Sequence, residues 1–285
     1  MQEFERHLQI LSESGNYAHF TSQTNKVAVD LMFEGKMNEA LALTTQSIPI
    51  IKAAFENTNS TNASVMETKQ NKLFCTLLVS ALHTHAWILE ELRRFDDAEP
   101  FMREALALME SKFGLDSFES TSLLSGLGRL LTRRGRFVEA EPALVRSLTI
   151  RQTEQSRQLE ISSAQEELSN LYCAMGRLDE SEILCSAAYT TGLKLFEKEN
   201  PELFAGYALC RARLWAAQGK HEEAVVLLNQ SITDTELTYG HLHPSHLDAL
   251  ALLQKCLQAT NQEAEAEKVD VRIGKICSQW ALERP

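Results

Sequence analysis

Glycine and proline are scarce in this sequence, with 12 glycines and six prolines among 285 residues. Strand-rich folds of this length need many more turn formers, so the scarcity disfavours a β-sandwich or barrel and favours helices. Hydrophobic residues make up 44% of the chain, which is ample for a buried core. The composition therefore predicts an all-α protein, built as two ordinary domains or as one elongated array of repeats.

Positive charge is also in short supply, because 28 lysines and arginines stand against 39 aspartates and glutamates, for a formal net charge of -11. Proteins that bind nucleic acids rely on a surplus of basic residues, so this balance disfavours such a partner. No stretch reaches the roughly eighteen consecutive apolar residues that span a bilayer. Met1–Ile10 mixes Glu, Arg and His, unlike a secretory signal. We expect a soluble, cytoplasmic protein without membrane insertion.

Cysteine pairs spaced as in metal or redox motifs are missing. No two of the six cysteines are separated by two residues, which disfavours a zinc ribbon and a thioredoxin-like motif. Each cysteine lies in an apolar stretch, so we expect buried, reduced thiols, which suit the cytosol. The six are Cys75, Cys173, Cys185, Cys210, Cys256 and Cys277.

One short phrase recurs six times, and Gly135–Ala140 is a clear copy of it. We call its first residue the closing position, because a Gly there supplies the left-handed conformation that ends a helix. The acidic residue that follows favours the N-terminus of the next helix. Successive copies are 58, 42, 41, 43 and 42 residues apart, so only the first interval is longer, by 16. The closing positions are Gly35, Arg93, Gly135, Gly176, Gly219 and Asn261.

Small and large residues keep fixed distances from the closing position. An Ala or Ser lies five residues after it, and small residues lie seven before it at Ala28, Ala86, Gly128, Ser169 and Ala212, with Gln254 as the exception. Large residues lie four before it, at Leu31, Leu89, Leu131, Tyr172, Trp215 and Leu257. Small and large side chains at fixed places predict antiparallel helices that interlock closely.

This pattern resembles the tetratricopeptide repeat, and its length of about 42 residues is similar to the longer variety found in kinesin light chains. Arg134–Pro142 and Tyr239–Pro244 match that variety closely, and Lys112–Ser117 and Glu199–Glu202 fall at the same inter-repeat turn as Tyr239–Pro244. The resemblance implies a right-handed α-α superhelical solenoid of about six helical hairpins. In each hairpin an A helix precedes the closing position and a B helix follows it.

The implied organisation is a single solenoid over 16–285, preceded by a capping helix over 1–15 in which Phe4, Leu8 and Leu11 have helical spacing. The 16 extra residues fall around Asn57–Ser64, where either an exposed loop or a helix extension would fit. The repeats are expected at 21–56, 70–115, 117–155, 158–198, 201–240 and 244–281.

The resemblance also implies that A helices line a concave groove, with one groove-facing position six residues before each closing position. Val29, Trp87, Arg129, Asn170, Arg213 and Lys255 hold that position, so the column begins apolar and becomes basic. A basic stripe inside an acidic protein would attract carboxylates. We expect the groove to bind its ligand through Arg129, Asn170, Arg213, Lys255, Trp87, Arg133, Asn25 and Glu166.

Alternatives to ligand binding remain open for these residues. Glu166 is expected to pair with a groove arginine and temper its charge, and solvated charges without any ligand remain an alternative for the whole column. The chaperone-binding clamp of the family uses paired Lys and Asn, whereas here Asn25 stands with Val29 and His83 with Trp87, which disfavours chaperone docking. Trp87 could instead accept an apolar anchor of a partner.

Catalytic and metal-binding patterns are largely missing. The sequence has no Gly-rich phosphate loop, paired metal-binding helix motif or nucleophile elbow, and its acidic pairs mostly fall at helix starts. His241, His243 and His246 form a cluster, but His243 with Pro244 falls at the inter-repeat turn, where this repeat variety carries His-Pro for structural reasons. We expect no enzyme activity, no cofactor and no metal.

The function that we expect from the sequence is an adaptor or scaffold that binds a protein or peptide segment, favouring acidic segments. The alternative is a regulator whose solenoid responds to a signalling peptide or small molecule. The last repeat departs from the pattern and ends in Ile276, Trp280 and Leu282, so it is either a cap or the interface of a homodimer.

Overall fold

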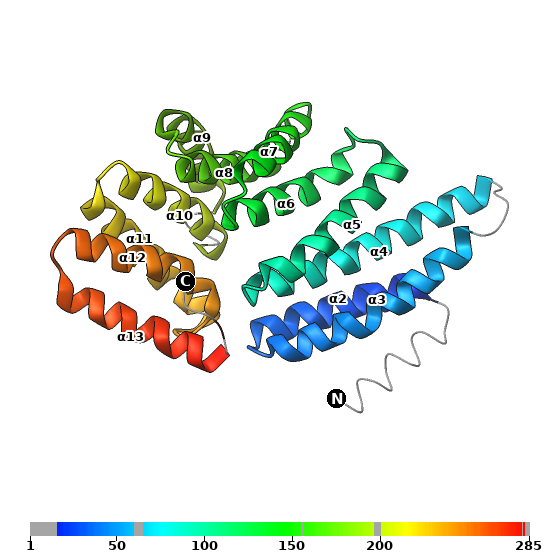
Figure 1. Cartoon of the computed structure of the whole chain (residues 1–285), viewed down its shortest axis with the longest axis horizontal. Coiled ribbons are helices and arrows are strands. Elements are labelled where there is room, and N and C mark those ends of the chain that lie inside the picture. Colours follow the sequence, from blue (N-terminus) through cyan, green and yellow to red (C-terminus); the bar gives the residue numbers. More distant parts are fainter. Residues whose placement is uncertain (1–15, 60–64, 155–156, 197–200, 281, 283–285) are drawn as a thin grey trace. The chain divides into compact units, whose positions relative to one another are not determined.

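The computed structural model describes residues 16–59, 65–154, 157–196, 201–280 and 282. These residues form twelve α-helices and two 3-10 helices and contain no strand, so the predicted all-α repeat fold is confirmed (Figure 1). The α-helices are α2 (Tyr17–Phe33), α3 (Met37–Asn59), α4 (Val65–Glu91), α5 (Phe95–Phe113), α6 (Thr121–Arg133), α7 (Phe137–Gln152), α8 (Gln158–Ala174), α9 (Leu178–Phe196), α10 (Pro201–Ala217), α11 (His221–Tyr239), α12 (Leu247–Ala259) and α13 (Glu263–Trp280). The 3-10 helices are η1 (Phe118–Ser120) and η2 (Pro244–His246).

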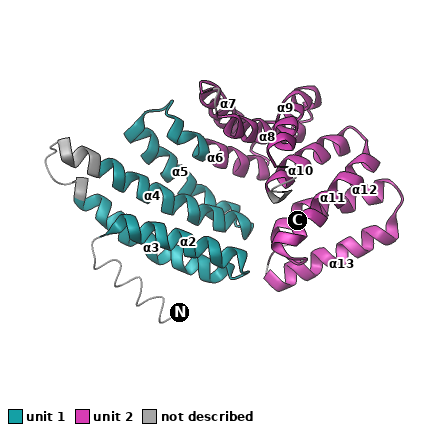
Figure 2. Cartoon of the chain, turned by 180° about the vertical axis from the view of Figure 1, so that it is seen from behind, with its two compact units in different colours: residues 1–123 teal, residues 124–285 magenta. Residues whose placement is uncertain are grey.

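The chain divides into two compact units, Met1–Leu123 and Leu124–Pro285, with the boundary inside α6 (Figure 2). In unit 1, α2 packs on α3 and α4, and α4 packs on α3 and α5. In unit 2, α8, α9 and α10 pack on one another, and α10 to α13 pack in chain order. Each unit is therefore a stack of neighbouring antiparallel helices, as repeats require.

The closing positions end their helices as the repeated phrase predicts. All six have a positive φ, from 57° at Arg93 and 58° at Asn261 to 83° at Gly35. At each one the following residue donates its backbone N–H to the carbonyl of the large residue four positions before the closing position, as Arg136 does to Leu131 at 2.9 Å. This bond satisfies a carbonyl that the helix end would otherwise leave without a partner.

The small residues sit at helix crossings. The Ala or Ser five residues after each closing position is at most 2% exposed. On the preceding helix, Ser169 is fully buried and its hydroxyl lies 2.9 Å from that of Ser181. A Cβ atom on Gly128 would lie 2.4 Å from Leu144 Cγ, so α6 and α7 approach more closely than any larger side chain allows. The predicted close approach of helices is confirmed.

Arg93 is the closing position least suited to its conformation. A non-Gly residue in the left-handed region costs about 1 kcal/mol or more. We expect Arg93→Gly to stabilise unit 1 by about 0.5–1 kcal/mol after the greater chain entropy of glycine is subtracted. Urea unfolding would measure the gain, with Arg94→Gly as the control because Arg94 has an ordinary φ of -85°. Equal effects of the two variants would contradict the account.

His85 is a buried histidine in the core of unit 1. Its ring is 5% exposed, its Nδ1 lies 2.7 Å from the Thr44 hydroxyl, and it packs edge-on against Phe101. Burial, helped by the charge of Arg94, lowers the pKa of His85 from 6.5 to about 4. In the unfolded chain His85 therefore binds a proton near pH 6.5, whereas in the folded unit it binds one only near pH 4.

We therefore expect unit 1 to lose about 3 kcal/mol of stability as the pH falls from 6.5 to 4. Trp87 fluorescence during urea unfolding reports on unit 1 once Trp215 and Trp280 are replaced by phenylalanine. His85→Leu should flatten the pH dependence, whereas His19→Leu, at an exposed histidine, should leave it unchanged. A steep acid loss that persists in His85→Leu would contradict the assignment.

The N-terminal part of the chain bears on two of the sequence predictions. The expected capping helix with Phe4, Leu8 and Leu11 lies outside the described residues. The extra residues of the first interval lengthen the flanking helices, since α3 runs to Asn59 and α4 begins at Val65, with 60–64 outside the described residues. Of the two alternatives left open by the sequence, helix extension accounts for the described part.

One helix of the described residues is long and apolar enough to cross a membrane by length and composition, namely Asn71–Glu91 within α4. Within its apolar 18-residue window, 61% is buried inside the protein. Leu78, Leu82 and Ile88 are at most 1% exposed, and α4 packs against α2, α3 and α5. The core position of α4 accounts for its apolar composition.

Candidate functional site

A pocket of about 550 Å³ in unit 2 is lined only by A helices, and we call it the A-helix pocket. Helices α6, α8 and α10 form its walls, and Leu252 of α12 completes it. Leu209 supplies apolar surface, Thr132 supplies a hydroxyl group, and six charged or amide side chains also line the space. They are Arg129, Arg133, Glu166, Glu167, Asn170 and Arg213.

Five of the eight expected groove residues meet in this pocket, and three do not. The five are Arg129, Arg133, Glu166, Asn170 and Arg213. Lys255 is exposed on α12 but does not line the pocket. Asn25 and Trp87 belong to unit 1, where Asn25 donates to the Ser80 hydroxyl at 2.8 Å and Trp87 donates to Glu91 at 3.1 Å. A binding role for all eight stays a prediction.

The arginines of the pocket are held by carboxylates and an amide from neighbouring A helices. Arg129 pairs with Glu167 at 3.4 Å, and Arg133 pairs with Asp248 at 2.9 Å. Arg213 donates to Asn170 Oδ1 at 3.2 Å and approaches Asp248 at 3.5 Å. The three arginine side chains remain about one-third exposed, so these contacts position them without burying them.

Glu166 differs from the other carboxylates of the pocket. Its carboxyl group lies over the α10 backbone, where a Cβ atom on Gly206 would be 3.2 Å from Glu166 Oε1. Among the described residues no hydrogen bond or ion pair reaches this carboxyl. Burial first, and then the charge of Glu167, raise the pKa of Glu166 to about 8, although Arg213 and Arg129 oppose the shift. The surroundings of Glu166 therefore favour its protonated form.

The expected pairing of Glu166 with a groove arginine is wrong. Glu167 and Asp248 take the arginines, and the sequence reasoning missed both, together with Cys173 and Gly206. A signal for Asp248 and Gly206 was present, because both lie 13 residues before a closing position. Positions 13, 10 and 6 before the closing position are three and four residues apart, so they share one helix face.

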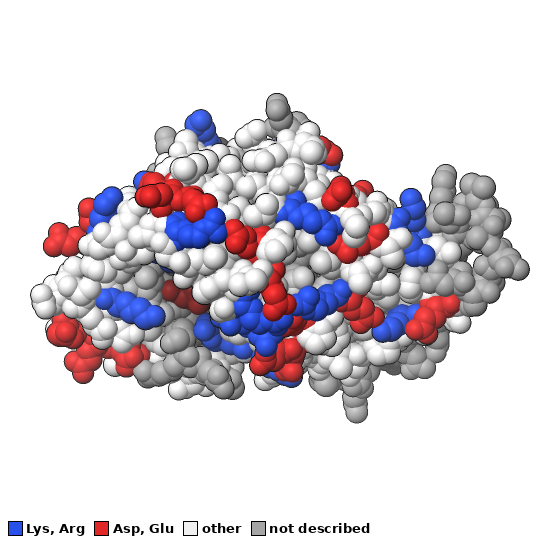
Figure 3. Space-filling model, turned by 45° about the horizontal axis from the view of Figure 1, so that its top comes forward, with Lys and Arg blue, Asp and Glu red and all other residues white. Residues whose placement is uncertain are grey.

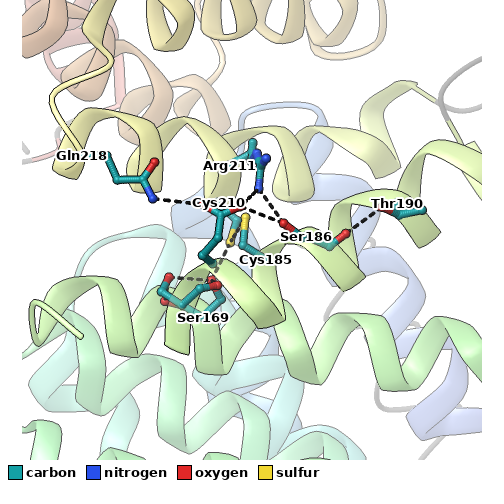
Figure 4. A network of polar contacts seen from close by, with 9 residues as sticks. Ser169, Cys185, Ser186, Thr190, Cys210, Arg211 and Gln218 are labelled. Atoms are coloured by element: carbon teal, nitrogen blue, oxygen red, sulfur yellow. Dashed lines mark hydrogen bonds and ion pairs between the residues drawn. The ribbon is translucent and has the colours of Figure 1, made fainter. Parts of the chain in front are cut away.

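A network of polar contacts behind the pocket joins α8, α9 and α10 (Figure 4). The Cys210 thiol lies 3.7 Å from Cys185 Sγ and 3.5 Å from the Ser169 hydroxyl. The hydrogen bond from Cys210 lowers the pKa of Cys185, and that same bond together with burial raises the pKa of Cys210. Next to them Arg211 donates to Glu182 at 2.7 Å and to Ser186 at 2.9 Å. These contacts fix the spacing of the helices that carry Glu166 and Arg213.

A second pocket of unit 2, of about 510 Å³, lies among α11, α12 and α13. Its Arg272 pairs with Glu236 at 2.6 Å and donates to the carbonyl of His241 at 2.7 Å. The arginine is only 14% exposed, so these contacts tie the last repeat together and leave little of it for a ligand. We regard the A-helix pocket as the better candidate site.

The histidine cluster serves the turn before α12. His243 accepts the backbone N–H of Ser245 at 3.2 Å, and His246 donates to the carbonyl of Gly240 at 2.9 Å. Both rings are buried, whereas His241 is exposed beside Glu236. No group of three metal-ligating side chains occurs within the described part of the chain. These contacts agree with the structural role expected for His243.

The visible surface in Figure 3 intersperses basic and acidic side chains and shows no large area of one sign. The acidic net charge of the chain is therefore spread out on this face. On this face, electrostatic selectivity depends on local arrangements of charge.

Residues 77–153 match the sequence model of the family described as Tetratricopeptide repeat. They run from within α4 to the end of α7, so this stretch of the chain carries tetratricopeptide repeats. The resemblance inferred from the repeated phrase is confirmed over this stretch. No curated protein sequence matches the chain.

Solved structures extend the likeness in fold. BtubC (BKLC) from P. vanneervenii is 15% identical and has a TM-score of 0.57, and the match covers 85% of this chain and 94% of that one. The Rap conjugation gene regulator of plasmid pLS20, solved with the Phr* peptide, is 13% identical and has a TM-score of 0.61. The match covers 92% of this chain and 76% of the regulator. Aspartyl phosphate phosphatase F from Bacillus subtilis is 11% identical and has a TM-score of 0.50. The match covers 91% of this chain and 74% of the phosphatase. At these identities the likeness concerns the fold.

Proposed function

We propose that this protein is an adaptor or scaffold that binds a peptide, or a segment of another protein, in the A-helix pocket of unit 2. The observation that carries the proposal is the lining, in which three successive A helices direct three arginines and an asparagine at one space. A volume of about 550 Å³ suits a few side chains of an extended segment. In such a binding site the stacked helices of the repeat fold hold the binding side chains in place.

A preference for acidic segments follows from the donors of the pocket. Each guanidinium group offers N–H donors in a fixed fork that fits a carboxylate. Arg129, Arg133 and Arg213 are already oriented by Glu167, Asp248 and Asn170, so a ligand carboxylate meets positioned donors. Leu209 and Leu252 offer an apolar surface on which a hydrophobic side chain next to that carboxylate in the ligand can pack.

A regulator controlled by a signalling peptide is the second candidate. The fold likeness to the Rap conjugation gene regulator, which was solved with the Phr* peptide, favours it. Small-angle scattering distinguishes the two candidates, because a regulator should change its radius of gyration when a peptide saturates it. An unchanged radius at saturation would support the constitutive scaffold.

The proposal extends to the setting in which the protein works. We propose a binding protein without catalytic activity that acts in the reducing cytoplasm, where its six cysteines, all free and five of them buried, would stay reduced. We also propose that the chain forms a homodimer through its terminal repeats. Its partners are proposed to be proteins or peptides and not nucleic acids or membranes.

A selection from a random peptide library displayed on phage tests the proposal. Immobilised full-length chain should enrich peptides that bind with micromolar or tighter affinity and compete with one another for one site. Enrichment of no sequence, or only of sequences that bind the heat-denatured chain equally well, would contradict it.

A further inference from the structure

The carboxyl group of Glu166 has no role in holding the A-helix pocket together. Glu167 and Asp248 pair with the arginines, and Asn170 accepts from Arg213, whereas no described residue hydrogen-bonds to the Glu166 side chain. Yet Glu166 lines the pocket and is seated over the bare backbone of Gly206. A polar group so placed, with protein on one side and the pocket on the other, is positioned to meet a ligand.

We propose that Glu166 holds a proton in the ligand-free pocket and donates it in a hydrogen bond to a carboxylate of the bound ligand, which Arg213 and Arg129 also contact. The inference rests on the proposed function, because it names the group that the peptide presents to the pocket. It makes Glu166 a determinant of specificity for carboxylates.

The surroundings explain why Glu166 keeps its proton. Glu167, its neighbour in the chain, is a second carboxylate, and α10 leaves room for the Glu166 carboxyl but gives it no donor at Gly206. Burial and Glu167 outweigh the arginines and raise the pKa of Glu166 to about 8. The titratable and charged groups around it are Arg129 and Arg133 on α6, Glu167 on α8, Cys185 on α9, Tyr207, Cys210 and Arg213 on α10, and Asp248 on α12.

The charge balance of the pocket then favours an anion. With Glu166 neutral, the three arginines that line the pocket outnumber its ionised carboxylate Glu167 together with Asp248. If Glu166 were ionised, the pocket would be balanced and its carboxylate would repel that of a ligand. A protonated carboxyl instead donates a short, charge-assisted hydrogen bond to a carboxylate.

A ligand ammonium group on ionised Glu166 is the opposite assignment. It would need to displace the proton of Glu166 and approach three arginines that repel it. The two assignments differ in sign with pH, because a carboxylate ligand binds best while Glu166 is protonated and an ammonium ligand binds best once it is ionised. The pH dependence of binding therefore separates them.

The test uses three fluorescein-labelled alanine peptides and the full chain. The first peptide has two internal glutamates and an amidated C-terminus, the second has glutamines in their place, and the third has no glutamate but a free C-terminal carboxylate. Fluorescence anisotropy from pH 6.5 to 9.5 compares the parent with Glu166→Gln, which is neutral at every pH. Glu160→Gln, at a half-buried glutamate of the same helix that does not line the pocket, is the matched control.

We expect the parent to bind a carboxylate peptide and to lose about tenfold in affinity between pH 7 and pH 9. Glu166→Gln should bind with an affinity that is flat over this range and should exceed the parent at pH 9, while Glu160→Gln should follow the parent. Whether the first or the third peptide binds identifies the source of the carboxylate, an acidic side chain or a chain terminus.

Several outcomes would overturn the inference. Equal pH dependence of the parent and Glu166→Gln would remove Glu166 from the site, and affinity that rises with pH would assign it to a cation. Peptides from the library that bind in the pocket without any carboxylate would overturn the inference and leave the proposed function standing. Absence of binding by every probe and every library peptide would overturn both.

Discussion

Reversing the charge of Arg213 should weaken the binding of a pocket peptide by about a hundredfold. Arg213 donates to Asn170 at 3.2 Å and approaches Asp248 at 3.5 Å, so it links α10 to the A helices on either side. Arg213→Glu removes a positioned donor and faces the ligand with a carboxylate near Glu167 and Asp248. The fold should survive, because the side chain of Arg213 is 34% exposed.

Isothermal titration calorimetry with a library-selected peptide measures the effect of Arg213→Glu. Lys194→Glu is the matched control, since Lys194 is exposed on the B helix α9 and undergoes the same change of charge. Lys255→Glu shows how far the ligand reaches along α12. If Lys194→Glu weakened binding as much as Arg213→Glu, the loss would reflect net charge and the A-helix pocket would not be the site.

Gly128→Ala should destabilise unit 2 by about 1–3 kcal/mol, even though alanine is the better helix former. The added Cβ would lie 2.4 Å from Leu144 Cγ and 2.6 Å from its Cδ2, and Leu144 is fully buried. The clash therefore forces α6 and α7 apart or pushes a core side chain out of its rotamer.

Thermal unfolding of Gly128→Ala and Gly206→Ala checks this prediction. Gly206 also lies within a helix, but its Cβ would meet the end of the Glu166 side chain at 3.2 Å, which can shift. We expect Gly206→Ala to be near neutral in stability while it disturbs the seat of Glu166. A loss of stability at Gly206 equal to that at Gly128 would show that the close helix crossing is not what requires Gly128.

The sequence predicted the features that depend on local structure. The left-handed closing positions, the small residues at helix crossings and the large residues that accept the closing hydrogen bond all follow from one repeated phrase, because each acts within a few residues of a helix end. Arg93 shows the strength of the pattern, since its place in the repeat required a conformation that arginine itself disfavours.

The ion-pair partners of the charged pocket residues could not be predicted from the repeated sequence pattern. Arg133 and Asp248 are far apart in sequence and pair only because α6 and α12 converge on one space. Glu166 and Glu167 are adjacent, yet one takes an arginine and the other lies over Gly206. Such choices depend on angles between helices, which periodicity does not determine.

The account stands on the claim that the A helices of unit 2 form the binding surface. Photo-crosslinking tests it most directly, with a library-selected peptide that carries a benzophenone and with mass spectrometry of the crosslinked chain. We predict crosslinks to α8 and α10, at pocket residues such as Cys173 and Leu209. Crosslinks confined to the B helices α7, α9 and α11 would contradict the claim.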